Sequence, residues 1–158
     1  MAYNTISLIS EGAVQKEALA SGSITPGMLL EQTSAAAATV KAHATAGDIA
    51  QAAFAVEDDL QGNGIDTVYA TTKRVLYKVF RPGDEVYAVL KNGQNIAIGD
   101  KLVSAGDGTL KKRTYPADSS AVVQEEHVVG YARNANDRSS SSSAIDAAES
   151  NRIIVEIC

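Results

Sequence analysis

Residues 24–30, 80–86 and 96–102 read ITPGMLL, FRPGDEV and IAIGDKL, which are three copies of one pattern. In each copy a glycine stands midway between two apolar residues, three positions from either. Glycine adopts positive φ without a Cβ clash, and in two copies a proline directly before it pre-sets the first corner of a turn. The pattern predicts sharp turns at these glycines between short strands, an arrangement typical of a small antiparallel β-barrel or β-sandwich.

The clearest strands lie next to the second and third turns. Residues 74–80 carry apolar side chains on both faces, and residues 86–90 are apolar throughout. Such strands need cover on both faces, from a closed barrel or from another subunit, so we expect a stable homo-oligomer. Asn92-Gly93 and residues 106–108 are predicted to form hairpin turns, and residues 152–157 are predicted to form a last strand that docks into a sheet.

Residues 33–56 contain signals for both helix and strand. The alanine run that starts at position 35 favours a helix on propensity alone. Apolar and polar residues alternate from Val40 to Thr45, however, as in a half-buried strand, and we favour strands. Val122-Val123 and Val128-Val129 are a further candidate strand pair.

The chain divides into two predicted parts. Residues 1–22 lack turn chemistry, and their apolar residues are too sparse for a core. This segment suits either a short helix near residues 12–20 or an extended N-terminal arm that lies on a neighbour, and we assign it as the arm. Residues 23–158 form the β-rich body, in which the serine-rich stretch 134–151 is expected to be an exposed, mobile loop.

Composition excludes several classes of function. The 158 residues carry a net charge of −5, so we expect one domain and no nucleic-acid partner. The basic run Lys111–Arg113 is assigned to a solvated hairpin end. The N-terminus lacks the features of a secretory signal, and no apolar run approaches the roughly 20 residues that span a bilayer. We therefore expect no membrane partner and synthesis in a cytoplasm.

Residues suited to catalysis or metal binding are sparse. His43 and His127 have no further ligands at a suitable spacing, and we interpret both as ordinary strand residues. The acidic stretch Glu57–Asp59, with Asp66, stands in a glycine-rich turn and matches no calcium loop. The single cysteine, Cys158, has no partner for a disulfide within the chain. We predict that the protein is not an enzyme and has no catalytic, cofactor-binding or metal-binding residues.

In their order along the chain, these phrases resemble the capsid decoration (cementing) proteins of tailed bacteriophages, over about residues 23 to 157. The phrases that carry the resemblance are ITPGMLLE at 24–31, FAVE at 54–57, VLYKV at 75–79, RPGDEV at 81–86, IAIGDKLVS at 96–104, GDGTL at 106–110, VGYA at 129–132 and RIIVE at 152–156, with Tyr69 between the second and third. Each phrase is a common combination of turn and strand, so the specificity lies in their order.

The resemblance implies a structural protein, usually a homotrimer, on the outer surface of the phage head. Such proteins staple neighbouring major capsid proteins against the pressure of the packaged DNA. An N-terminal arm often reaches across the capsid, and we expect Tyr3, Ile6 and Leu8 to contact the capsid or a neighbouring protomer. The alternative is a β-rich surface module for adhesion or glycan binding, although the chain has no tryptophan for a stacking platform.

Overall fold

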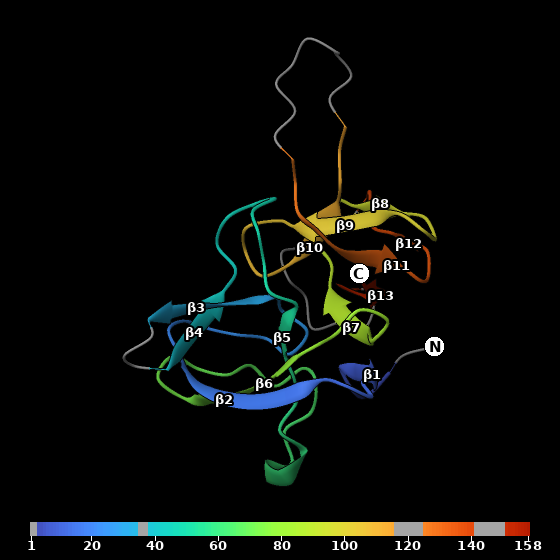
Figure 1. Cartoon of the computed structure of the whole chain (residues 1–158). Helices are drawn as coiled ribbons and strands as arrows, with labels where there is room; N and C mark the ends of the chain where they lie inside the picture. The colour runs from blue at the N-terminus through green and yellow to red at the C-terminus, as the bar shows by residue number, and fades with distance from the viewer. Residues whose placement is uncertain (1–2, 35–37, 116–124, 141–150) are drawn as a thin grey trace.

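The computed structural model describes residues 3–34, 38–115, 125–140 and 151–158 and shows a mainly β protein (Figure 1). Its elements run in the order β1 (Ser7–Ile9), β2 (Val14–Ala20), β3 (Leu30–Ser34), β4 (Thr39–Ala42), β5 (Ala53–Ala55), the 3-10 helix η1 (Asp59–Gln61), β6 (Arg74–Val79), β7 (Glu85–Val89), β8 (Asn95–Ile96), β9 (Lys101–Ser104), β10 (Leu110–Lys112), β11 (Val128–Ala132), β12 (Asn136–Asp137) and β13 (Arg152–Ile157). The prediction of a mainly β fold is confirmed.

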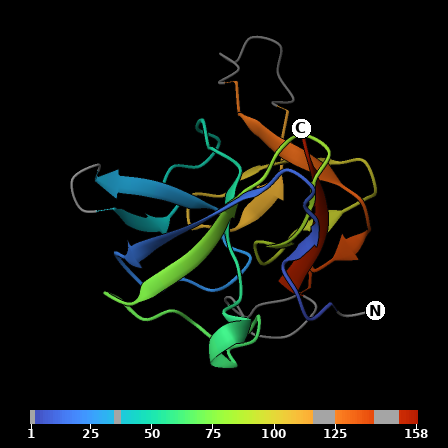
Figure 2. The same cartoon turned by 60° about the horizontal axis from the view of Figure 1, so that its bottom comes forward.

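Within the ranges that the structure describes, the strands form two larger sheets and a two-stranded ribbon. One sheet has the order β1-β7-β13-β11-β9-β10, the other has the order β3-β4-β2-β6-β5, and β12 pairs with β8. Among the named strands of the described residues, all pairs are antiparallel except that of β2 and β4. In the part of the chain that the structure describes, neither sheet closes on itself, so the body is like a β-sandwich and is not a closed barrel (Figures 1 and 2).

The last strand lies inside the six-stranded sheet, as its sequence predicts. β13 pairs with β7 from Arg152 opposite Val89 to Glu156 opposite Glu85, and with β11 on its other side. Its alternate residues Ile153 and Val155 are fully buried. The C-terminal strand is thus held on both edges.

The three predicted glycine turns are confirmed. Gly27, Gly83 and Gly99 have φ of 92°, 94° and 85°. Gly27 also joins the two sheets, because its N–H donates to the carbonyl of Ala55 in β5 and its carbonyl accepts from the N–H of Val89 in β7. A glycine is required there for a second reason, since a Cβ would lie 2.9 Å from the carbonyl oxygen of Tyr87.

The strands with two apolar faces bury most of this apolar surface against other parts of the same chain. Residues 86–90 are all buried, and they divide between two core clusters. In β6, Val75 belongs to the cluster of the five-stranded sheet, whereas Leu76 packs against the larger cluster. The expected requirement for a closed barrel or a second subunit therefore does not follow from these strands, because two packed sheets cover both faces.

The N-terminal segment is extended, but it is also part of the body. β1 pairs with the edge of β7, and β2 pairs with β6 along six residues, from Val14 opposite Val79 to Leu19 opposite Arg74. β2 is an interior strand with β4 on its other side. The boundary drawn at residue 22 from sequence therefore does not separate an unpaired segment from the sheets.

The remaining local predictions have mixed outcomes. Residues 106–108 connect the antiparallel pair β9 and β10, as expected of a hairpin turn. Gly93 has a turn conformation with φ of 78°, but β7 and β8 do not pair, since β7 lies between β1 and β13. The region 33–56 forms β3, β4 and β5, as favoured. Val128-Val129 starts β11, whereas Val122-Val123 lies outside the described residues.

Candidate functional site

The outer face of β2 and β6 carries two adjoining hollows. The larger has a volume of about 620 Å³ and lies between this sheet face and the loop of residues 58–70, which contains η1. The smaller, of about 360 Å³, extends toward Thr5, Ser7 and Ser10 in the N-terminal segment. Both hollows are lined by Gln15, Asp58, Leu60 and Leu76. They therefore form one continuous groove, which we call the β2–β6 groove.

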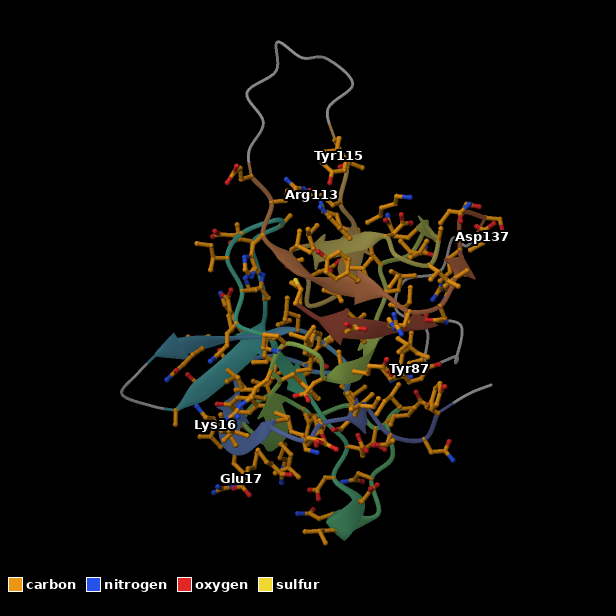
Figure 3. All side chains as sticks on the ribbon, turned by 45° about the vertical axis from the view of Figure 1, so that its right-hand side comes forward. Lys16, Glu17, Tyr87, Arg113, Tyr115 and Asp137 are labelled. Atoms are coloured by element: carbon orange, nitrogen blue, oxygen red, sulfur yellow. The ribbon has the colours of Figure 1, made fainter. Side chains whose placement is uncertain are left out.

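Strand pairing places the floor of the groove. Gln15 and Glu17 of β2 lie opposite Lys78 and Leu76 of β6, and because antiparallel partners share a face, these side chains point to the same side. η1 projects from the body beside this sheet (Figures 1 and 2). The side chains of Lys16 and Glu17 lie far from the foot of the long β10–β11 connection, where Arg113 and Tyr115 are found (Figure 3).

The loop of residues 58–70 is anchored from behind by Arg152. This guanidinium, in β13, is only 3% exposed, pairs with Asp66 at 2.8 Å, and donates to the carbonyl of Ile65 at 2.7 Å. It also donates to the carbonyl of Pro26 at 3.3 Å. A buried charge with these partners holds the loop against the six-stranded sheet, so the wall of the groove is pre-formed.

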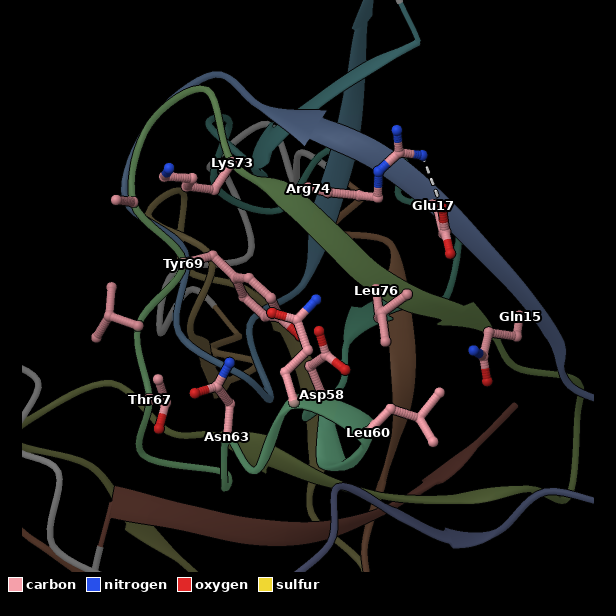
Figure 4. Close-up of a pocket in the computed structure, with 13 residues that line it drawn as sticks. Gln15, Glu17, Asp58, Leu60, Asn63, Thr67, Tyr69, Lys73, Arg74 and Leu76 are labelled. Atoms are coloured by element: carbon pink, nitrogen blue, oxygen red, sulfur yellow. Dashed lines mark hydrogen bonds and ion pairs between the residues drawn. The ribbon is translucent and has the colours of Figure 1, made fainter.

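Tyr69 closes the inner end of the groove. Its hydroxyl donates to the carbonyl of Val56 at 2.6 Å, and its backbone pairs with Ile24 in an isolated bridge. Asp58 and Asn63 line the same hollow as Tyr69 (Figure 4). Burial of the hydroxyl, and next the Asp58 carboxylate, raise the pKa of Tyr69 to about 12. The phenol is therefore neutral at physiological pH and serves as a fixed donor.

Several polar side chains of the larger hollow are uncommitted. Arg74 and Glu17 form an exposed ion pair at 2.8 Å (Figure 4). In contrast, the structure shows no side-chain hydrogen bond or ion pair, within the described part of the chain, for Gln15, Gln61, Asn63, Thr67 and Lys73. These side chains are free to bind a partner. None of them was singled out from sequence, because only the folded loop brings them to β2 and β6.

Aliphatic side chains stand exposed at the rim. Leu60 is 98% exposed at the tip of η1, and Val68 is 49% exposed. Leu19, which lies on the same face of β2 as Glu17, is 43% exposed. Exposed aliphatic side chains that gather beside a hollow offer apolar surface to another protein.

The residues predicted to contact a capsid or a neighbouring protomer lie near one another. Ile6 is fully buried in the chain's own core and has no surface for a partner in this conformation. Tyr3 and Leu8 are half-buried, and the ring of Tyr3 meets that of Tyr87 edge to face at 5.4 Å. The segment is fastened by Glu57, which accepts hydrogen bonds from the hydroxyl of Thr5 and the N–H of Ile6. Tyr3 and Leu8 thus retain partial exposure, whereas Ile6 does not.

His43 has more specific partners than an ordinary strand residue. It follows β4, is 3% exposed, and its Nδ1 lies 2.7 Å from the hydroxyl of Ser104, while its Nε2 lies 3.8 Å from Glu31. This order of serine, histidine and carboxylate is not arranged for nucleophilic catalysis, because Ser104 is fully buried and a substrate cannot reach its hydroxyl. His127 lies just before β11 and is exposed.

The basic run Lys111–Arg113 has partners within the fold. Lys111 pairs with Glu126 at 2.9 Å and Lys112 with Asp100 at 2.7 Å, while Arg113 lies over the ring of Tyr115. Among the residues that the structure describes, no three metal-ligating side chains gather in a group. Within the same ranges, no helix is long and apolar enough to cross a bilayer.

Comparison with known proteins yields a similarity of fold. No family profile matches the chain, and no curated protein matches it in sequence. Among solved structures, the chain resembles the head fiber gp8.5 N base of bacteriophage phi29, with a TM-score of 0.55. The match covers 92% of this chain and 94% of that chain, at 14% sequence identity. At this identity the likeness shows that the two proteins share a fold.

Proposed function

We propose that this protein is a structural component of a bacteriophage virion that attaches to the outer surface of the head. The observation that carries the proposal is the similarity of fold to a phage head fiber base over nearly the whole of both chains. The order of turn and strand phrases supports the same class of protein independently of that similarity. The protein is made in the host cytoplasm and binds the head after it has expanded.

On the head, we propose that the protein acts as a decoration protein and staples neighbouring major capsid proteins. We also propose that it does so as a homotrimer. The exposed aliphatic side chains of Leu60 and Ile49, which are 98% and 81% exposed, support the existence of protein contacts beyond the single chain. Tyr3 and Leu8 add partly exposed apolar surface at the N-terminal segment.

Attachment is tested with purified heads of the parent phage that were assembled without this protein. The expected result is saturable co-sedimentation of the chain with these heads, and density on their outer surface by electron microscopy. The stapling role is tested separately, by the temperature at which heads rupture and release DNA with and without the bound protein. Attachment without any change in rupture temperature would restrict the function to that of an anchored appendage, and absence of attachment contradicts the proposal.

A further inference from the structure

We propose that the β2–β6 groove binds an extended segment of a capsid subunit, with an aliphatic residue of that segment seated against Leu60 and an acidic residue opposite Lys73. The groove is defined by this chain's own residues, and the identity of the partner as a capsid subunit rests on the proposed function.

The shape of the groove suits an extended chain. The two hollows share four lining residues and run along one sheet face, from Lys73 and Arg74 at one end to Thr5 and Ser10 at the other. Their combined form is long and open, whereas a compact ligand needs a single enclosed cavity. The anchored loop of residues 58–70 fixes one wall before binding, which lowers the ordering cost of association.

Leu60 supplies the apolar anchor. The side chain is 98% exposed at the tip of η1, between the two hollows, and Leu76 lies half-buried on the floor below. A leucine held away from its own core on a short helix contributes little to folding. Its contact with an aliphatic side chain of a partner removes apolar surface from water on both sides.

The polar groups match a peptide backbone. Gln15, Gln61 and Asn63 each carry a side-chain amide, which donates and accepts hydrogen bonds as a peptide group does. The charge changes along the groove. Uncommitted Lys73 lies beside Arg74 at one end, and Asp58 lies in the part that the two hollows share. The smaller hollow beyond it is lined by two further carboxylates, Glu57 and Asp59, and by one cation, Lys78. A segment with an acidic residue and a basic residue at opposite ends complements this arrangement.

A saccharide suits the groove less well. Sugar rings are commonly held on an exposed aromatic face, but Tyr69 is the aromatic residue of the lining, and it is only 8% exposed. Its hydroxyl is already committed to the carbonyl of Val56. The accessible apolar walls are aliphatic, from Leu60, Val68 and Leu76. The groove therefore favours a polypeptide over a glycan.

The test compares two groove variants with a matched control on purified heads that lack the protein. Leu60→Asp and Lys73→Glu are each expected to weaken head binding by about tenfold or more. Ile98→Asp makes the same apolar-to-acidic change at a 70% exposed position between β8 and β9, outside the groove, and is expected to leave binding unchanged. Circular dichroism and sedimentation confirm that all three variants keep the fold and assembly state of the wild type.

A photo-crosslinking amino acid at position 60, followed by mass spectrometry of the conjugate, identifies the partner segment. The expected conjugate is one stretch of the capsid protein, and reversing the charge of its acidic residue should restore binding to Lys73→Glu. Wild-type binding that both groove variants retain overturns the inference alone. Absence of wild-type binding overturns the proposed function and the capsid segment with it. If the groove variants lose binding to a neutral oligosaccharide but still bind heads as the wild type does, the groove is a glycan site and the inference is wrong.

Discussion

At the scale of single residues, Gly27 does more than turn the chain. Its N–H donates to Ala55 in β5 and its carbonyl accepts from Val89 in β7, so it links the two sheets. Gly83, by comparison, has the same positive φ, but a Cβ added to it meets nothing within 4 Å. The two glycines therefore share a backbone requirement and differ in steric constraint.

This difference predicts unequal costs for the same substitution. Gly83→Ala should lower the free energy of unfolding by about 1–2 kcal/mol, because an L-residue is forced into the left-handed region. Gly27→Ala should cost more than about 2 kcal/mol, since its Cβ also meets the carbonyl of Tyr87. Urea denaturation measures both, with Gly22→Ala as a control expected within about 0.5 kcal/mol of wild type. Equal costs at Gly27 and Gly83 would contradict the additional steric constraint at Gly27.

Arg152 illustrates how burial changes the value of an ion pair. The Arg152 side chain is 2% exposed and Asp66 is 49% exposed, whereas Arg74 and Glu17 are both well exposed at the same separation of 2.8 Å. Solvent screens the second pair and compensates for its loss. Solvent cannot compensate for the loss of Asp66, because it does not reach the buried Arg152 guanidinium.

We therefore predict that Asp66→Ala lowers the free energy of unfolding by about 2–3 kcal/mol, because it leaves a buried charge without its counter-ion. Glu17→Ala should cost less than about 1 kcal/mol. The double variant Asp66→Ala, Arg152→Met should recover much of the loss, since it removes the charge as well. Chemical denaturation of the three variants measures these changes in the free energy of unfolding. A cost for Asp66→Ala no larger than that for Glu17→Ala would show that the buried pair does not anchor the loop.

Tyr69 predicts a dependence of stability on alkaline pH. Its pKa is raised from 10.0 to about 12, so the folded state favours the neutral phenol. Below pH 10 this contribution is fully present, and it is lost as the pH rises toward 12, because the phenol of the unfolded chain ionises first. Tyr69→Phe should therefore show a shallower fall in the free energy of unfolding over this range than wild type. Parallel curves for the two proteins would contradict the assignment.

At the scale of elements, the N-terminal strands have unequal roles. β1 lies at the edge of its sheet and contributes the buried Ile6 just before it. β2 lies between β4 and β6, so its loss would separate the remaining strands of the five-stranded sheet. The segment that resembles an arm in sequence is therefore half edge strand and half interior strand.

Truncation separates these roles. Removal of residues 1–12 should leave a folded but less stable protein, because an edge strand and one buried isoleucine are lost. Removal of residues 1–20 should abolish cooperative folding, since β6 loses its pairing partner along six residues. Thermal melting followed by circular dichroism measures both truncations. A cooperative transition after removal of residues 1–20 would show that the body folds without β2.

At the scale of the whole molecule, the oligomeric state is a prediction that does not depend on the strands with two apolar faces. The two core clusters cover residues 86–90 within one chain, so these strands do not require a partner. We expect a homotrimer nevertheless, from the resemblance to decoration proteins and from the exposed aliphatic side chain of Ile49. Sedimentation equilibrium at micromolar concentration should give three times the mass of the chain. A monomer at that concentration contradicts the prediction.

The sequence by itself determined the local structure of this protein. Glycines flanked by apolar residues marked the turns at Gly27, Gly83 and Gly99, because positive φ is a property of one residue and its neighbours. Alternation of apolar and polar residues marked β4 and β13, because successive side chains of a strand point to opposite faces.

The tertiary structure alone decided which distant segments meet. Gly93 forms its turn, yet β7 pairs with β13 and not with β8, because pairing depends on the edges that the assembled sheet leaves free. Arg152 reaches Asp66 across 86 positions of sequence, and His43 reaches Ser104 across 61. The β2–β6 groove likewise joins a loop to a sheet face that no local pattern connects. Such contacts depend on the relative placement of two sheets, and this placement follows from how the entire core packs.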